Sequence, residues 1–265
     1  MKDFNKIVKN LGNISGKLFF KEDIYELIDP EKKPEYTSLL NKTIYKLKAQ
    51  GIILGIKAGV YLVPTQDDMK LNKIDLLDKY YLKLLKKIIT KEVGSHYYIS
   101  GQKSLEIHMK NYEIADRIFV VNRNINKRVK IGDKEIVFKT ISGNVNTGKV
   151  KKINLYSKFA TTVVTKNIED VDIKISSLEL SLLEAALITD SEVGFDIGLI
   201  SKALKKYSSV LNKGHFYEIG KYKYIMSFNR LKELSKDLDD DLYKLFLDII
   251  KVNGGLFIGE TLRGI

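Results

Sequence analysis

The sequence predicts an α+β protein in which a small helix-and-hairpin domain precedes a larger α+β domain. Three observations lead to this prediction. Residues 36–64 combine a helical pattern, a glycine and two short strand-like runs; residues 117–175 alternate apolar and polar side chains; and helical spacing returns after Ser176. Helices repeat their apolar residues every three to four positions, whereas strands alternate, so the two patterns separate the elements.

The N-terminal domain is expected to span residues 1–67 and to follow the order of a winged helix-turn-helix domain. Amphipathic spacing predicts helices at 3–11, 21–28 and 36–50. The third helix has Leu40, Ile44 and Leu47 on one side and ends at Gly51, a residue suited to the left-handed conformation after a helix. Runs of β-branched residues at 52–56 and 60–63, joined by a glycine-containing turn, predict a hairpin.

The polar side of the third predicted helix carries side chains of the types that contact DNA. Asn, Lys, Ser and Thr contact base edges in the major groove, and Lys also contacts phosphates. The expected DNA-binding residues of this domain are Lys33 before the helix, Thr37, Ser38, Asn41, Lys42, Tyr45 and Lys46 on it, and Lys57 at the hairpin tip. The alternative is that the helix and hairpin belong to a small α+β core whose polar residues merely face water.

The charge of the chain favours an anionic partner. The formal net charge is +12, from 45 Lys and Arg against 33 Asp and Glu, and such an excess attracts nucleic acid in a salt-dependent way. The excess lies in residues 1–175. Its middle part contains Arg123, Lys127, Arg128 and Lys130, which either extend a DNA surface, face an RNA or protein partner, or form the solvated rim of a Lys-rich sheet.

The second domain, residues 68–265, is expected to contain a small, mainly antiparallel sheet and a helical C-terminal part. Helical spacing predicts a connecting helix at 71–89, which either packs in this domain or links the two domains, and a helix at 102–108. Ser176 or Ser177 is expected to cap the next helix. Strands are predicted near 118–121, 129–131, 135–141, 151–155, 161–165 and 171–175, with glycine-containing turns at 132–133 and 143–146.

Enzymatic chemistry has little support in the sequence. The chain has no cysteine, which excludes disulfides and thiolate metal sites and agrees with a reducing cytoplasm. His96, His108 and His215 do not have the spacing of a metal triad. Neither a phosphate-binding loop nor an apolar stretch long enough to span a membrane occurs. We therefore expect a cytoplasmic protein that is not an enzyme and needs no cofactor.

Acidic residues are the remaining candidates for catalysis. Glu179 and Glu184 lie on one predicted helix but not on one face of it, so we expect one capping or ion-paired carboxylate and one solvated carboxylate. Three consecutive aspartates, residues 239–241, are expected to begin a helix rather than to hold a metal ion. An enzyme that acts on nucleic acid stays a hypothesis, which Glu179→Gln or Glu184→Gln would support by abolishing a DNA-modifying activity while leaving binding intact.

Four segments in register resemble the AbiEi-type antitoxins of bacterial abortive-infection systems. LKAQGIILGIKAGVYLVP resembles the end of their N-terminal domain, and YYISGQKSLEIH, IADRIFVVN and VDIKISSLELSLLEAAL resemble three later segments, so that the similarity covers residues 20–190. Two positions differ from the family pattern. Leu180 stands where the family often has Arg, and Glu184 stands where it often has Asp.

The resemblance implies a function for each domain. A winged-helix domain of this family represses its own operon at inverted repeats in double-stranded DNA. The second domain counteracts a co-encoded nucleotidyltransferase-like toxin without a stable complex. The alternative is a stand-alone winged-helix transcription factor with a ligand-sensing second domain, and the presence or absence of a neighbouring toxin gene distinguishes the two.

Overall fold

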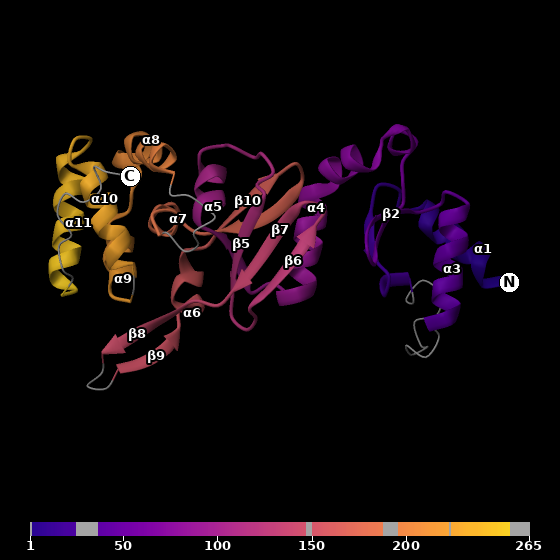
Figure 1. The fold of residues 1–265 in the computed structure, drawn as a ribbon, viewed down its shortest axis with the longest axis horizontal. Helices are drawn as coiled ribbons and strands as arrows, with labels where there is room; N and C mark the ends of the chain where they lie inside the picture. Colours follow the sequence, from indigo (N-terminus) through magenta and orange to yellow (C-terminus); the bar gives the residue numbers. More distant parts are fainter. Residues whose placement is uncertain (1, 25–36, 147–149, 188–195, 223, 255–265) are drawn as a thin grey trace. The chain divides into compact units, whose positions relative to one another are not determined.

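The chain forms an α+β structure with two compact units (Figure 1). The computed structural model describes residues 2–24, 37–146, 150–187, 196–222 and 224–254 of the 265 residues. Unit 1 is Met1–Lys87 and unit 2 is Ile88–Ile265. The division falls within helix α4 (Lys73–Val93), whereas the sequence placed the domain boundary after residue 67.

Besides the 3-10 helix Asp68–Lys70 and the part of α4 up to Lys87, unit 1 contains two described helices and a three-stranded antiparallel sheet. The elements are α1 (Lys2–Gly12), β1 (Leu18–Phe20), α3 (Thr37–Ala49), β2 (Leu54–Lys57) and β3 (Val60–Leu62), and the strand order is β1-β3-β2. Strand β1 was not predicted, because three residues are too few to show an alternating pattern. The helix expected at 21–28 runs into residues outside the described part of the chain, and Lys33 also lies outside it.

The core of unit 1 explains the apolar spacing of α3. Leu40, Ile44 and Leu47 are buried, and they pack with Ile7, Leu11, Phe19, Ile24, Ile53 and Val63. Gly51 follows the helix with a φ of 69°, and the N–H of Ile52 donates to the carbonyl of Leu47. Gly51 therefore ends α3 in the left-handed conformation that the sequence predicted.

A buried carboxylate holds the segment that follows the hairpin. Asp68 is fully buried and accepts hydrogen bonds from Thr65 N–H at 2.8 Å, Lys79 Nζ at 2.7 Å and Tyr80 OH at 2.7 Å. Burial alone would raise the pKa of Asp68, but these bonds outweigh it and lower the pKa to about 2. Burial, followed by the hydrogen bond to Asp68 and the charge of Asp68, raises the pKa of Tyr80 to about 12. Asp68 thus ties the end of the hairpin to the first half of α4.

Replacing Asp68 with asparagine is expected to lower the free energy of unfolding by about 2 kcal/mol at pH 7. The native pKa lies below the ordinary value of 3.8. The stabilisation is therefore present above about pH 4 and is lost as the pH falls towards 2. Urea denaturation at a series of pH values measures the difference. Asp67→Asn is the control, because the ion pair between Asp67 and Lys70 is exposed. If the difference in the free energy of unfolding between the parent and Asp68→Asn stays constant down to pH 2, the ion-pair interpretation is contradicted.

Unit 2 is built on a six-stranded sheet with the order β10-β11-β4-β5-β7-β6. Its strands are β4 (Tyr97–Ser100), β5 (Arg117–Asn122), β6 (Lys127–Ile131), β7 (Lys134–Lys139), β10 (Val164–Ile168) and β11 (Val171–Ile175). Three of the five strand pairings are antiparallel, as predicted, but β11 pairs with β4, and β5 with β7, in parallel, so the sheet is mixed. The apolar strand β7 enters the sheet beside β5, which leaves the charged strand β6 at the edge.

Two segments of the sheet region differ from the sequence prediction. Residues 143–146 were expected to form a turn, but they belong to β8 (Ser142–Asn146), which pairs with β9 (Val150–Asn154) as a separate hairpin. Figure 1 shows that this hairpin projects away from the six-stranded sheet. The strand expected at 161–165 begins later, at Val164, because a 3-10 helix occupies Ala160–Thr162.

Helices cover one face of the sheet and form the C-terminal part of unit 2. Within this unit, α5 and α7 lie against the sheet, and α8 to α11 lie beyond α7 (Figure 1). Ser177 and Asp239 cap α7 and α11, so these two predicted helix starts are confirmed, and Asp196 caps α8. The helices are α5 (Gly101–His108), α6 (Tyr156–Phe159), α7 (Leu178–Ala185), α8 (Ile197–Tyr207), α9 (Lys213–Gly220), α10 (Ile225–Ser235) and α11 (Asp240–Val252).

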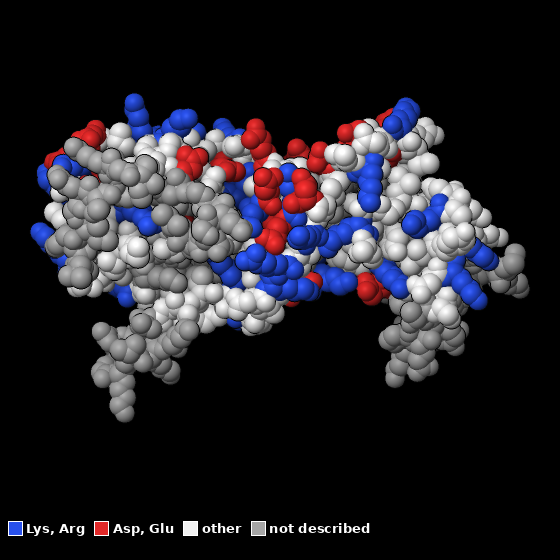
Figure 2. All heavy atoms as spheres, in the orientation of Figure 1, with Lys and Arg blue, Asp and Glu red and all other residues white. Residues whose placement is uncertain are grey.

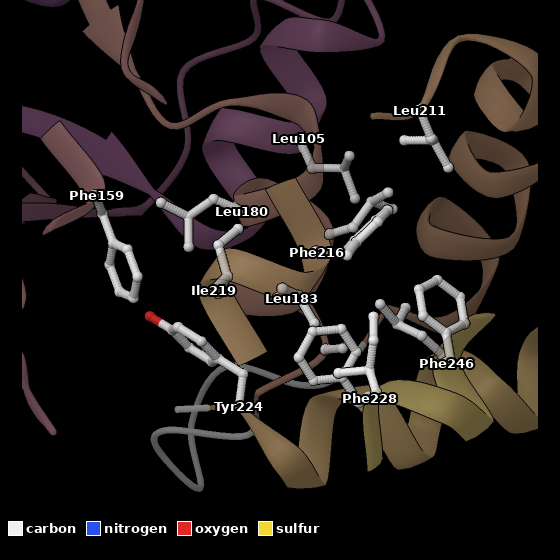
Figure 3. Close-up of a cluster of buried hydrophobic side chains, with 14 of the residues drawn as sticks. Leu105, Phe159, Leu180, Leu183, Leu211, Phe216, Ile219, Tyr224, Phe228 and Phe246 are labelled. Carbon is white, nitrogen blue, oxygen red and sulfur yellow. The ribbon is translucent and has the colours of Figure 1, made fainter. Parts of the chain in front are cut away.

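Aromatic side chains fill the core between α7 and the C-terminal helices. Phe216 lies edge-on to Phe246 with ring centres 5.1 Å apart and to Phe228 with ring centres 6.1 Å apart. Figure 3 shows these rings beside Leu183 of α7. This core holds α7 against both the sheet and the C-terminal helices.

Candidate nucleic-acid interface

The exposed side of α3 carries most of the residues that the sequence assigned to DNA. Ser38, Asn41, Lys42 and Lys46 are exposed, and Tyr45 is 74% exposed. Thr37 is the first residue of α3. The five exposed residues share one side of the helix, because the opposite side, with Leu40, Ile44 and Leu47, is buried in the core. The side chains of Asn41 and Lys42 are therefore accessible to a partner.

The hairpin β2–β3 follows directly after α3. Lys57 is the last residue of β2, is partly exposed, and faces Val60 across the turn, with Gly59 at a φ of 75°. The pairing shifts register between Gly55 and Lys57, which is a bulge. Lys48, which is not among the residues expected to bind DNA, also belongs to this region, because its Nζ lies 3.8 Å from where a Cβ of residue 55 would be.

The four basic residues assigned in the middle of the chain lie in unit 2, apart in sequence from α3. Lys127 pairs with Glu92 at 2.7 Å, Arg128 lies 3.8 Å from Glu135, and Arg123 lies over the ring of Tyr156. Lys127 to Lys130 belong to the edge strand β6, where charged side chains hinder pairing with another sheet. In Figure 2, Lys and Arg side chains lie beside Asp and Glu side chains over the strands β5 to β7. These local contacts favour the interpretation that the basic side chains form a solvated, partly neutralised rim of the sheet.

A buried carboxylate joins two of the segments that carry the family resemblance. Glu184 of α7 accepts hydrogen bonds from Gly101 N–H at 3.1 Å, Ser176 OH at 3.0 Å and Tyr98 OH at 3.2 Å. The cap position Ser100 makes no side-chain bond to α5, so Glu184 supplies the carboxylate at the start of that helix. Burial raises the pKa of Glu184, and Lys139 together with the hydrogen bonds acts against this rise.

Serine hydroxyls extend this network between α5 and α7. Ser104, Ser176 and Ser181 lie within 2.7 to 3.0 Å of one another and are all buried. Glu179 is also buried and accepts from the N–H of Asn212 at 2.8 Å, at the start of α9. The expectation that one of the two glutamates is solvated is therefore wrong. Sequence reasoning missed this because their partners lie far away along the chain.

A pocket of about 610 Å³ lies next to Glu184 in unit 2. Its charged side chains are largely paired with other protein groups. Lys103 donates to Glu106 at 2.8 Å and to the carbonyls of Asn111 and Glu113, and Arg117 pairs with Glu135 at 2.9 Å. Lys139 lies over the ring of Phe119. These contacts hold the pocket walls in place and do not form a nucleophile and base pair of a hydrolytic site.

The three histidines are separate from one another. His108 Nε2 lies 2.9 Å from the Ser176 carbonyl, and burial lowers the pKa of His108. His215 Nδ1 lies 3.4 Å from Glu179, and His96 is exposed. Within the part of the chain that the structure describes, no three His, Cys, Asp or Glu side chains gather in a way that could hold a metal ion.

Comparisons with known proteins bear on the fold. The chain matches no protein-family model, and no curated protein matches its sequence. Its structure is similar to the crystal structure of the RV2827C protein from Mycobacterium tuberculosis, with a TM-score of 0.56 and 11% sequence identity over 95% of this chain and 81% of that one. At this identity the likeness concerns the fold alone.

A membrane-crossing helix needs about 20 predominantly apolar residues. None of the helices in the described ranges is both long and apolar enough to cross a membrane.

Proposed function

We propose that this chain is a double-stranded DNA-binding protein and that residues 1–67 form a winged helix-turn-helix domain with α3 as its recognition helix. One observation carries the proposal: Asn41, Lys42, Tyr45 and Lys46 are exposed along one side of α3, while its other side is anchored in the core. The hairpin β2–β3 follows α3 as a wing follows a recognition helix. The order of these elements supports a helix that enters the major groove and a hairpin beside it.

The chemistry of this surface fits DNA. Asn41 can donate to and accept from an adenine, and Lys42 can donate to a guanine or to a phosphate. Neither Lys42 nor Lys46 forms an ion pair with a residue in the described ranges. Their charge is therefore available for phosphate oxygens, and the net charge of +12 would attract the polyanion.

The antitoxin role is proposed on the family resemblance. In this proposal the protein represses its own operon at inverted repeats and counteracts a co-encoded nucleotidyltransferase-like toxin without a stable complex. Co-expression with the adjacent reading frame tests it. Growth that is arrested by the neighbour alone and restored by co-expression is the expected result. A neighbour without toxicity would favour the alternative of a stand-alone transcription factor.

The alternative has one supporting observation, the pocket of about 610 Å³ in unit 2. Its volume is within the range of small-molecule sites. Because the charged groups at its walls are already paired, we place the autoregulatory antitoxin first. A metabolite-dependent change in promoter affinity would reverse that order.

Lys42→Ala is expected to weaken binding to the duplex upstream of the protein's own gene by about tenfold, because one groove or phosphate contact is lost. Lys57→Ala is expected to weaken binding to this duplex and to an unrelated duplex by the same factor, since a hairpin lysine contacts phosphate. Band shifts at two salt concentrations measure both effects. Lys202→Ala, an exposed lysine of α8, is the control. If both variants bind the duplex as tightly as the parent does, α3 and the hairpin do not contact the DNA.

A further inference from the structure

The exposed side of α3 has a centre and two basic flanks. An α-helix turns about 100° per residue, and the buried stripe of α3 consists of Leu40, Thr43, Ile44 and Leu47. Tyr45 and Lys42 therefore point within about 30° of the direction opposite this stripe, whereas Lys46 and Lys48 point about 70° and 90° to either side of that direction. All four side chains are exposed. A helix in the major groove has base edges in front of it and a phosphate backbone on each side. The arrangement of the four side chains matches that of these groups.

Tyr45 is the unusual residue at the centre. With 74% of its surface exposed, it is the most exposed of the large hydrophobic side chains in the described ranges. Lone exposed apolar side chains are common on protein surfaces. This one, however, is surrounded by Ser38, Asn41 and Lys42 on the side of α3 that faces outward. The apolar group that DNA presents in the major groove is the 5-methyl group of thymine.

Lys48 reaches from α3 to the hairpin. Its Nζ and Cε both lie 3.8 Å from where a Cβ of Gly55 would be, so the ammonium lies between the helix and β2. A DNA strand that passes between a recognition helix and a wing would place its phosphates in this gap. Lys46, on the other flank, would meet the opposite strand.

We infer that Tyr45 recognises a thymine methyl group in the major groove and that Lys46 and Lys48 contact the phosphates of the two opposite strands. The inference rests on the proposed function and identifies the partner more closely, as B-form DNA with a thymine facing the middle of α3. It also assigns Lys48 to the interface. A single methyl group separates thymine from uracil, which makes the contact with Tyr45 testable without changing base pairing.

The experiment measures binding to the duplex upstream of the protein's own gene and to the same duplex with deoxyuridine in place of thymidine. The parent should bind the deoxyuridine duplex about fourfold more weakly for each methyl group that it contacts. Tyr45→Ala should bind both duplexes equally. Tyr45→Phe keeps the ring and should keep the parent's preference. A phenylalanine variant that behaves like the alanine variant would assign the contact to the hydroxyl group and overturn the methyl recognition.

Salt titrations test the flanks on the same duplexes. Lys46→Ala and Lys48→Ala should each reduce the slope of log affinity against log salt by about 0.9, while the fourfold preference for thymine stays. Lys202→Ala should leave the slope unchanged. An unchanged slope for Lys48→Ala would remove Lys48 from the interface. Equal binding of the parent to thymine and uracil duplexes would overturn the inference alone, whereas no preference of the parent for its own promoter over unrelated DNA would overturn the proposed function with it.

Discussion

Replacing Glu184 with alanine is expected to lower the free energy of unfolding by about 3 kcal/mol near pH 7. The carboxylate is buried and is the shared acceptor for Tyr98 OH, Gly101 N–H and Ser176 OH. Alanine would leave these buried donors without this acceptor and would leave a cavity at the junction of α5 and α7. Urea denaturation followed by circular dichroism measures the loss.

Glu184→Gln is the matched variant, because it keeps the shape of the side chain and one acceptor oxygen. It is expected to unfold within about 1 kcal/mol of the parent at neutral pH. The difference in stability between the parent and Glu184→Gln is also expected to depend on pH. Burial raises the pKa of Glu184, so the native protein holds a proton at pH values where the unfolded chain has lost it.

The sign of this pH effect follows from proton linkage. The part of the stability that comes from the proton on Glu184 is complete below the pKa of the unfolded chain and is lost as the pH rises through the native pKa. Glutamine does not titrate. The parent should therefore lose stability relative to Glu184→Gln as the pH rises above about 4. If the difference in the free energy of unfolding between the parent and Glu184→Gln does not change with pH, the role of this network is contradicted. An alanine variant as stable as the parent would also contradict it.

Changing Lys42 and Lys46 together to glutamate is expected to weaken binding to the promoter duplex by about a thousandfold. The two lysines lie one turn apart on the exposed side of α3. Each substitution removes a cation and places a carboxylate against the phosphates, so attraction becomes repulsion. Fluorescence anisotropy at a fixed salt concentration measures the loss. Circular dichroism should show an unchanged fold, because neither side chain belongs to the core.

The control for this experiment changes the net charge by the same amount elsewhere. Lys202→Glu with Lys205→Glu removes two exposed cations from α8 in unit 2. It should weaken binding only slightly, since these side chains are not at the proposed interface. Equal losses in the two double variants would show that net charge, rather than α3, determines binding.

Local patterns predicted most elements of both units, although strand β1 was not among them. The helix expected at 36–50 is α3, and the hairpin that follows it is present as β2 and β3. The alternating residues of 117–175 form strands. Neighbours in the sheet were not predictable, because the pattern of one strand does not specify its partner. The parallel pairing of β5 with β7 depends instead on burying Ile136 and Phe138 and leaving Lys127 and Lys130 at the edge.

Residues that act through distant partners were beyond sequence reasoning. Glu184 bonds to Gly101, which lies 83 positions earlier, and Glu179 bonds to Asn212, which lies 33 positions later. Nothing in the helix sequence distinguishes such carboxylates from solvated ones. Lys48 was missed for a related reason. Its position on the flank of α3 is visible in the periodicity, but its approach to Gly55 depends on how the hairpin folds back.

The sequence by itself determined the α+β class, the buried stripe of α3 and the outward direction of Asn41, Lys42 and Tyr45. These properties depend on residues a few positions apart, and the geometry of one helix links them. Only the tertiary structure decided which strands are neighbours, which carboxylates are buried and which lysines are already paired. Those outcomes depend on contacts between residues far apart in the chain, where burial and hydrogen bonding, rather than local periodicity, set the free energy.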